Sequence, residues 1–215
     1  MFIGHFAVGF AAKKFAPRSS LAVLLAAPLF LDILWPVFVL AGWEQVRIAP
    51  GNTRFTALEF VSYPWSHSLV MSVVWASVFA LIYQTIARYW PGTVVIWLGV
   101  VSHWVLDWVV HGPDMPLYPG GPRIGLGLWN SILGTMVVEL GMFAAGVWLY
   151  VRATRARDRI GRYAFAAYLG LLLAIYIANC FGSPPPSTNA AAWAGVGLTV
   201  IFIPWAWWFD RHREG

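Results

Sequence analysis

The sequence predicts an all-α protein, a polytopic membrane helix bundle of about six transmembrane helices plus a short N-terminal half-helix. Hydrophobic residues make up 60% of the 215 residues, and charged residues only 11%. A soluble domain has roughly 25% charged residues, so this chain lacks the charge to solvate its own surface. A helix that crosses a bilayer needs about 20 apolar residues, and the chain contains several such runs. We expect residues 1–215 to form a single integral membrane domain.

The N-terminal segment is apolar but too short to cross a bilayer. Its apolar residues precede Lys13 and Lys14, the reverse of the order in a secretory signal, so we do not expect a cleaved signal. Residues 2–15 are expected to form an interfacial helix or a half-helix that enters the bundle from the cytoplasmic side. In a half-helix, a rise of about 1.5 Å per residue would carry His5 roughly 12 Å beyond Lys13, near the middle of the membrane.

Six longer apolar runs, bounded by charged residues or by glycine and proline, predict the transmembrane helices. They are residues 19–40, 66–90, 93–111, 130–151, 161–182 and 190–209. Helices are expected because backbone amides in lipid must be hydrogen-bonded within their own segment. No run shows the alternation of apolar and polar residues that is typical of a membrane barrel strand. The longest stretches between elements, 41–65 and 112–129, fall on the same side. We expect them to form a lid or mouth over an outward-facing site.

Positive charge is concentrated on one side of the predicted bundle. Eleven of the 14 Lys and Arg residues lie on that side, and only Arg47, Arg54 and Arg123 lie on the other. The positive-inside rule therefore predicts that both termini are cytoplasmic. The arginines belong to membrane loops rather than to a folded basic domain, so nucleic acid is not an expected partner. The expected partners are the lipid bilayer and a lipid or amphiphilic substrate, and the oligomeric state is left open.

Ionisable residues inside the predicted spans are the candidate functional residues, because in lipid they must be paired, solvated or bound to a metal. They are Asp32, His103, Asp107, His111 and Glu139, with His67 at the mouth of the second span. His103, Asp107 and His111 recur every four residues and form one stripe on a helix. Asp32, His103 and Glu139 lie at similar depths. Four helices therefore direct polar groups at one cavity, with His5 at its floor.

Imidazoles mixed with carboxylates suit a divalent metal, with zinc as the first expectation and manganese or iron as alternatives. The expected ligands are His5, Asp32, His67, His103, Asp107 and His111. Asp32 or Glu139 would act as the catalytic base, and Glu139 would alternatively support the ligands. Ser66 and Ser68 are expected to cap a helix or to hydrogen-bond the site. The alternative to a metal is a structural core in which the polar residues pair with one another.

Four short motifs occur within residues 1–115. They are Gly4-His5-Phe6-Ala7-Val8-Gly9, Pro28-Leu29-Phe30-Leu31-Asp32, Ser66-His67-Ser68 and His103-xxx-Asp107. Together they resemble the LexA-regulated, inner-membrane metal-dependent hydrolases of bacteria. The resemblance implies a multi-pass protein of the bacterial inner (cytoplasmic) membrane with a metal site at His5, Asp32, His67, His103 and Asp107. That family has a Pro-Asp-x-Asp motif where this chain has only Asp32. With fewer ligands, the site would bind one metal rather than two, or would be inactive.

Together, these observations predict a membrane-embedded metal-dependent hydrolase whose His/Asp site opens to the periplasmic side. It would act on an ester or phosphoester of a lipid or amphiphile. A permease or ion carrier using the same residues is one alternative, and it predicts polar groups that continue to the cytoplasmic face. A non-catalytic membrane scaffold is another, in which loss of the polar stripe changes only stability or assembly.

Overall fold

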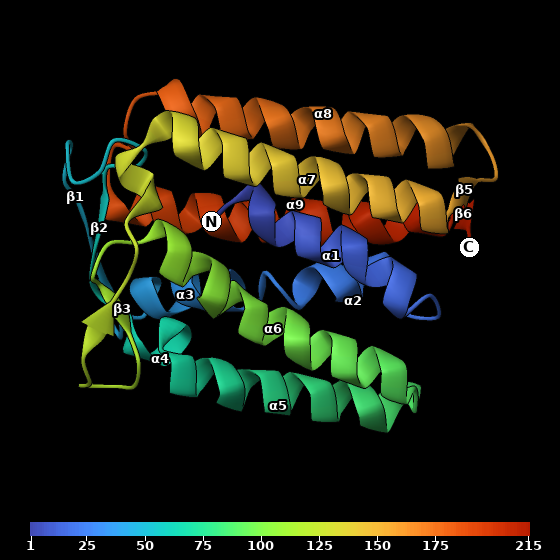
Figure 1. The fold of residues 1–215 in the computed structure, drawn as a ribbon, viewed down its shortest axis with the longest axis horizontal. Coiled ribbons are helices and arrows are strands. Elements are labelled where there is room, and N and C mark those ends of the chain that lie inside the picture. Colours follow the sequence, from blue (N-terminus) through green and yellow to red (C-terminus); the bar gives the residue numbers. More distant parts are fainter.

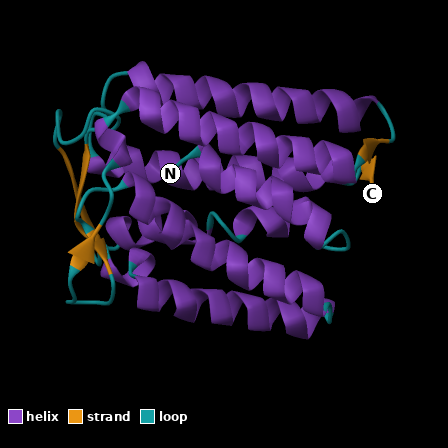
Figure 2. Cartoon of the chain, in the orientation of Figure 1, coloured by secondary structure: helices purple, strands orange, loops and turns teal.

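A computed structural model describes all 215 residues as nine α-helices, one short 3-10 helix and three two-stranded sheets. The helices run along one common axis, and the strands lie only at the two ends of the molecule (Figures 1 and 2). This arrangement confirms the predicted all-α bundle.

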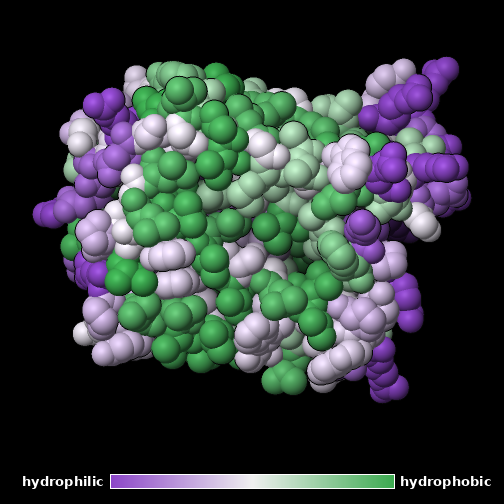
Figure 3. Space-filling view, in the orientation of Figure 1, coloured by the Kyte–Doolittle hydropathy of each residue, from purple (hydrophilic) through white to green (hydrophobic).

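Five helices are long and apolar enough to cross a membrane. They are α5 (Leu69–Ala87), α6 (Trp90–Val110), α7 (Ile132–Ala153), α8 (Arg159–Phe181) and α9 (Thr188–Asp210). They correspond to five of the six predicted spans, with every boundary within three residues. Apolar side chains cover the middle of the molecule and polar ones gather at both ends (Figure 3). Such a surface suits a protein whose middle faces lipid.

The prediction of one continuous helix over residues 19–40 was wrong. This segment is divided into α2 (Leu21–Ala26) and α3 (Phe30–Leu40), with a turn over residues 27–29 between them. Pro28 explains the interruption, because its ring nitrogen carries no hydrogen to donate to the preceding turn. The bundle therefore has five helices long enough to cross a membrane, and the first predicted span consists of two shorter helices.

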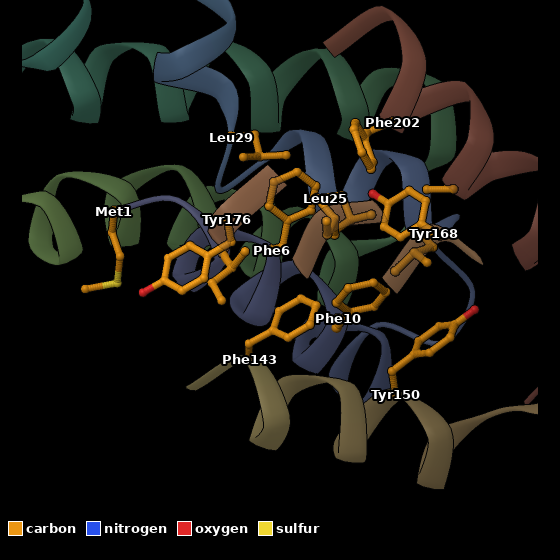
Figure 4. Packing of buried hydrophobic residues seen from close by; sticks show 14 of the residues in the cluster. Met1, Phe6, Phe10, Leu25, Leu29, Phe143, Tyr150, Tyr168, Tyr176 and Phe202 are labelled. Carbon is orange, nitrogen blue, oxygen red and sulfur yellow. The ribbon is translucent and has the colours of Figure 1, made fainter. Parts of the chain in front are cut away.

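Helix α1 (Ile3–Phe15) is the predicted half-helix, and it lies inside the bundle rather than at its surface (Figure 1). It packs most extensively on α7, where Gly146 allows close approach because an added Cβ would collide with the Ala7 carbonyl oxygen. Figure 4 shows Phe6 and Phe10 of α1 surrounded by aromatic side chains of α7, α8 and α9. The surrounding residues that it labels are Phe143, Tyr150, Tyr168, Tyr176 and Phe202. The interfacial alternative for this segment was therefore wrong.

The shorter elements define the two ends of the bundle. At one end, called here the loop end, β1 (Gln45–Ile48) pairs with β2 (Leu58–Ser62), and β3 (Met115–Pro116) pairs with β4 (Arg123–Ile124), both antiparallel. The loop end also carries α4 (Pro64–His67) and η1 (Leu128–Asn130). At the opposite end, the tail end, β5 (Arg155–Ala156) pairs with β6 (Arg213–Glu214) and so fixes the C-terminal tail.

Candidate metal centre

A buried cluster of histidine and aspartate side chains lies where α1, α3, α4 and α6 meet. His5 comes from α1, Asp32 from the first turn of α3, His67 from the end of α4, and His103 and Asp107 from one face of α6. The three histidines and Asp107 are at most 3% exposed. The half-helix brings His5 to this depth, and the break before α3 brings Asp32 to the same place. The structure therefore assembles five of the six predicted metal ligands.

The atoms of this cluster have the spacing of metal ligands. His67 Nε2 and His103 Nε2 are 3.1 Å apart. Asp107 Oδ2 lies 3.1 Å from His103 Nε2 and 3.8 Å from His67 Nε2. Asp32 Oδ1 lies 3.5 Å from His67 Nε2 and 3.9 Å from His103 Nε2. Tetrahedral zinc with bonds of about 2.0–2.1 Å places its ligand atoms about 3.3 Å apart, so these separations suit a shared ion.

A backbone carbonyl fixes the tautomer of His103. Its Nδ1 lies 2.7 Å from the carbonyl oxygen of Pro28, in the turn that interrupts the first crossing. A carbonyl only accepts hydrogen bonds, so Nδ1 carries the hydrogen and donates it. In the neutral ring, Nε2 then presents a lone pair to the cluster. The break at Pro28 thus supports the site directly.

A second support, through Ser66 and the unforeseen Glu44, fixes the tautomer of His67. The Ser66 hydroxyl donates to Glu44 Oε2 at 2.6 Å, so it accepts the Nδ1 hydrogen of His67 across 2.7 Å. Glu44 Oε1 accepts the backbone N–H groups of Trp65 and Ser66. Glu44 is only 2% exposed although it lies in the loop before β1. The expectation that Ser66 bonds the site is confirmed, and Ser68 caps α5.

These two supports occupy both Nδ1 atoms and turn both Nε2 atoms toward the cluster. His67 Nε2 and His103 Nε2 lie 3.1 Å apart, and His103 Nε2 also lies 3.1 Å from Asp107 Oδ2. With both rings neutral, the two Nε2 lone pairs would face each other, and a cation between them would remove the repulsion. The adjacent Asp32 and Asp107 carboxylates add negative charge that suits a divalent ion. The donor set fits zinc, and it also fits manganese or iron.

His5 orients Asp107 in this geometry. The two imidazole rings of His5 and His103 stack with centroids 3.8 Å apart. His5 Nε2 lies 3.1 Å from Asp107 Oδ1, and the Met1 amine contacts the same oxygen. Asp107 Oδ2 is thereby left to face His67 and His103. His5, His103 and Asp107 also have the spacing of a metal-binding set, so His5 would be a ligand for an ion on the Oδ1 side.

Two other predicted site residues lie beside the cluster. His111 Nδ1 lies 3.1 Å from Asp114 Oδ1, and its Nε2 lies 3.8 Å from Asp107 Oδ2. Glu139 Oε2 accepts the backbone N–H groups of Phe2 at 2.9 Å and Gly4 at 3.2 Å. Glu139 therefore caps the N-terminal end of α1, where the helix dipole favours a carboxylate. It acts on the cluster through the placement of α1.

The cluster reaches a pocket through Asp32. The Asp32 side chain is 45% exposed, and it lines an apolar pocket whose other walls come from α1, α3 and α9. Toward the loop end, aromatic rings of Phe60, Tyr63 and Trp129 pack around His111, with centroids 4.8, 5.9 and 4.2 Å from its ring.

Comparisons of the chain with protein-family models, with curated proteins and with solved structures gave no match. The resemblance to the LexA-regulated inner-membrane hydrolases therefore rests on the four short motifs in residues 1–115. The arrangement of His5, Asp32, His67, His103 and Asp107 is the main guide to function.

Proposed function

We propose that the protein is a membrane-embedded, metal-dependent hydrolase that acts on an ester or phosphoester of a membrane lipid or amphiphile. The observation that carries this proposal is the approach of His67 Nε2 and His103 Nε2 to 3.1 Å beside two carboxylates, while both Nδ1 atoms are hydrogen-bonded outside the cluster. A divalent metal bound there, zinc first and manganese or iron as alternatives, supplies a water molecule that ionises near neutral pH.

The chain's own residues have distinct tasks in this proposal. His67, His103 and Asp107 Oδ2 hold the ion, and His5 keeps Asp107 in position. Asp32 faces the pocket, so it is the residue placed to accept a proton from the attacking water. The water oxygen bonds to the acyl carbon or phosphorus while the ester bond breaks. Asp32 then returns the proton to the departing alkoxide.

The surroundings of the site favour a substrate from the bilayer. The pocket at Asp32 is lined mainly by hydrophobic residues, several of which are partly exposed. An apolar ligand reaches such a pocket without leaving the membrane. The arginine distribution supports a cytoplasmic tail end and a periplasmic loop end in the bacterial inner membrane, and in this proposal the site lies in the periplasmic half.

A permease that uses the same residues receives less support. A translocation path would need polar groups from the cluster to the tail end. That part of the interior is filled by a cluster of buried aromatic side chains around α1. Its rings pack edge-on, as at Phe10 and Tyr168, whose centroids are 6.1 Å apart. The hydrolase proposal needs no such path.

Elemental analysis tests the proposal. The detergent-purified protein is loaded with Zn²⁺ or Mn²⁺, dialysed, and compared with His67→Ala, His103→Ala and the tail-end control His212→Ala. We expect about one bound ion per chain in the wild type and the control, and loss in both cluster variants. No metal in the wild type after loading with either ion would refute the proposal. Turnover of vesicle lipids by the loaded protein, abolished in Asp32→Asn, tests the hydrolysis itself, and the metal content of that variant separates a base from a ligand.

A further inference from the structure

Two pockets lie along the seam between α3 and α9. The deep pocket is the one that reaches Asp32, with a volume of about 110 Å³. Its apolar walls include Ile33, Leu198 and Phe202. The end pocket, with a volume of about 320 Å³, lies at the loop end. Its polar lining residues are Glu44, Gln45, Arg47, Thr188 and Asn189.

The helix spacing shows that the two pockets are stacked along the same direction. On α3, Asp32 lines the deep pocket, and Val39, seven residues later, lines the end pocket. On α9, Thr188 lines the end pocket, and Gly195, seven residues later, lines the deep pocket. Seven residues of helix span about 10.5 Å, so both helices give the same offset. The seam therefore runs from a polar mouth to an apolar interior.

We infer that the α3–α9 seam binds one membrane lipid, with its headgroup in the end pocket and one hydrocarbon chain in the deep pocket. The inference rests on the proposed function and names the route by which its substrate reaches Asp32. Sites for whole small molecules have volumes of about 300–1000 Å³. The end pocket is in this range, whereas the deep pocket is smaller and suits a segment of one chain.

The walls of the deep pocket are partly exposed on the apolar surface of the bundle. Among these wall residues are Ile33 on α3 and Leu198 and Ile203 on α9. A lipid in the seam would continue this apolar surface, and its headgroup would lie at the level of the loop end. This is the orientation that a lipid already has in the membrane, so it enters sideways without turning over.

Polar atoms occur where a lipid ester or phosphoester would pass the site. Trp35 lines the deep pocket beside Asp32, is only 8% exposed, and has an indole Nε1 with no hydrogen-bond partner. A buried donor of this kind is normally paired, so it offers a hydrogen bond to an oxygen of the ligand. In the end pocket, Arg47 and Asn189 offer donors to a headgroup, although Arg47 also pairs with Glu59 at 2.8 Å.

The chain offers a matched pair of glycines for a test. A Cβ at Gly195 would lie 3.4 Å from Pro36 Cγ, which is an ordinary contact, so a leucine there would extend into the deep pocket. A Cβ at Gly197 would meet no atom within 4 Å. Gly195→Leu therefore fills the seam, and Gly197→Leu places the same side chain in open space on the same helix.

The experiment uses the full chain in vesicles that contain phosphatidylglycerol with a diazirine midway along one acyl chain. After irradiation, cross-linked peptides are mapped by mass spectrometry. We expect cross-links to concentrate on Ile33, Leu198 and Phe202, to fall about tenfold in Gly195→Leu, and to change less than about twofold in Gly197→Leu. If Gly195→Leu does not fold, Leu198→Phe obstructs the same pocket from the same helix.

Cross-links spread evenly over the lipid-facing helices, or unchanged in Gly195→Leu, would overturn the inference. Metal content measured on the same samples separates the two proposals. Bound metal with evenly spread cross-links refutes the lipid seam alone. Cross-links confined to the seam in a protein that binds no metal support the seam and refute the hydrolase.

Discussion

Replacing Ser66 with alanine tests whether His67 is held as a metal ligand by its neighbours. The Ser66 hydroxyl stands between the imidazole and Glu44, accepting from His67 Nδ1 at 2.7 Å and donating to Glu44 Oε2 at 2.6 Å. The substitution removes this hydroxyl and leaves the ring in place. Glu44 keeps its two backbone donors, so α4 remains capped.

The size of the effect follows from the lost acceptor. A buried N–H group without a partner costs on the order of 1–3 kcal/mol. Neutral His67 escapes this cost by moving its hydrogen to Nε2, and in that tautomer Nε2 cannot bind a metal. Since about 1.4 kcal/mol corresponds to a tenfold change in affinity, we expect metal binding to weaken about 10–100-fold, the usual range for residues that support ligands.

The assay is a competition titration of Zn²⁺ between the purified protein and a chelating indicator, with Ser68→Ala as the matched control. Ser68 is also buried, but its hydroxyl accepts from the Met71 N–H and caps α5. Its loss should lower the free energy of unfolding by about 0.5–2 kcal/mol and leave the zinc affinity unchanged. Equal losses of affinity in the two variants, or a change below about twofold in Ser66→Ala, would refute the assigned tautomer.

Three further predictions concern Glu139 and the tail end. Glu139→Ala should lower the melting temperature of the metal-free protein, because loss of the α1 cap costs on the order of 1–3 kcal/mol. An unchanged melting temperature with lost turnover would instead indicate that Glu139 is a catalytic base. Lys13→Ala should destabilise the protein more than Lys14→Ala in denaturant titrations, because Lys13 binds Asp210 at 2.9 Å and Lys14 is exposed. The Gly161 N–H and then His212 hold the pKa of Asp158 below its usual value, so stability from this carboxylate is present above about pH 4 and is lost as the pH falls through the lowered pKa. Asp158→Asn should therefore reduce the loss of melting temperature on acidification, and an identical pH profile would contradict this assignment.

Most of the bundle follows from the length of its apolar runs, because five of them are long enough to satisfy their own backbone within lipid. The break at Pro28 was less visible. Residues 19–40 have the length of a span, and the proline alone did not show that the crossing divides into two helices. Whether the helix breaks there depends on tertiary packing, because His103 Nδ1 from α6 donates a hydrogen bond to the Pro28 carbonyl oxygen in the turn.

The cluster was predictable where helical spacing applies and not beyond it. His103 and Asp107 lie one turn apart on α6, and their contact follows from that spacing. His111 continues the same four-residue rhythm, but α6 ends at Val110, and His111 has extended backbone with φ −66° and ψ 153°. Its Nδ1 therefore meets Asp114, while its Nε2 stays at the edge of the cluster, 3.8 Å from Asp107 Oδ2.

Partners distant in sequence gave no local signal. Glu44 reaches Ser66 across 22 residues, and nothing in the loop before β1 distinguishes it from a solvated glutamate. Glu139 was expected at the depth of the site, which is correct, but its partners are the first N–H groups of α1. That contact depends on α1 docking on α7, which composition and spacing do not predict.

The pattern of hydrogen bonds favours the proposed metal centre over a structural polar core. A structural core pairs each donor with an acceptor, because unpaired polar groups are unfavourable in an apolar interior. Here, the Nδ1 atoms of His67 and His103 are paired with Ser66 and the Pro28 carbonyl, on the sides away from the cluster. Their Nε2 atoms are turned toward each other and toward the Asp32 and Asp107 carboxylates. With both rings neutral, these are acceptors facing acceptors, and this arrangement supports the proposed divalent cation.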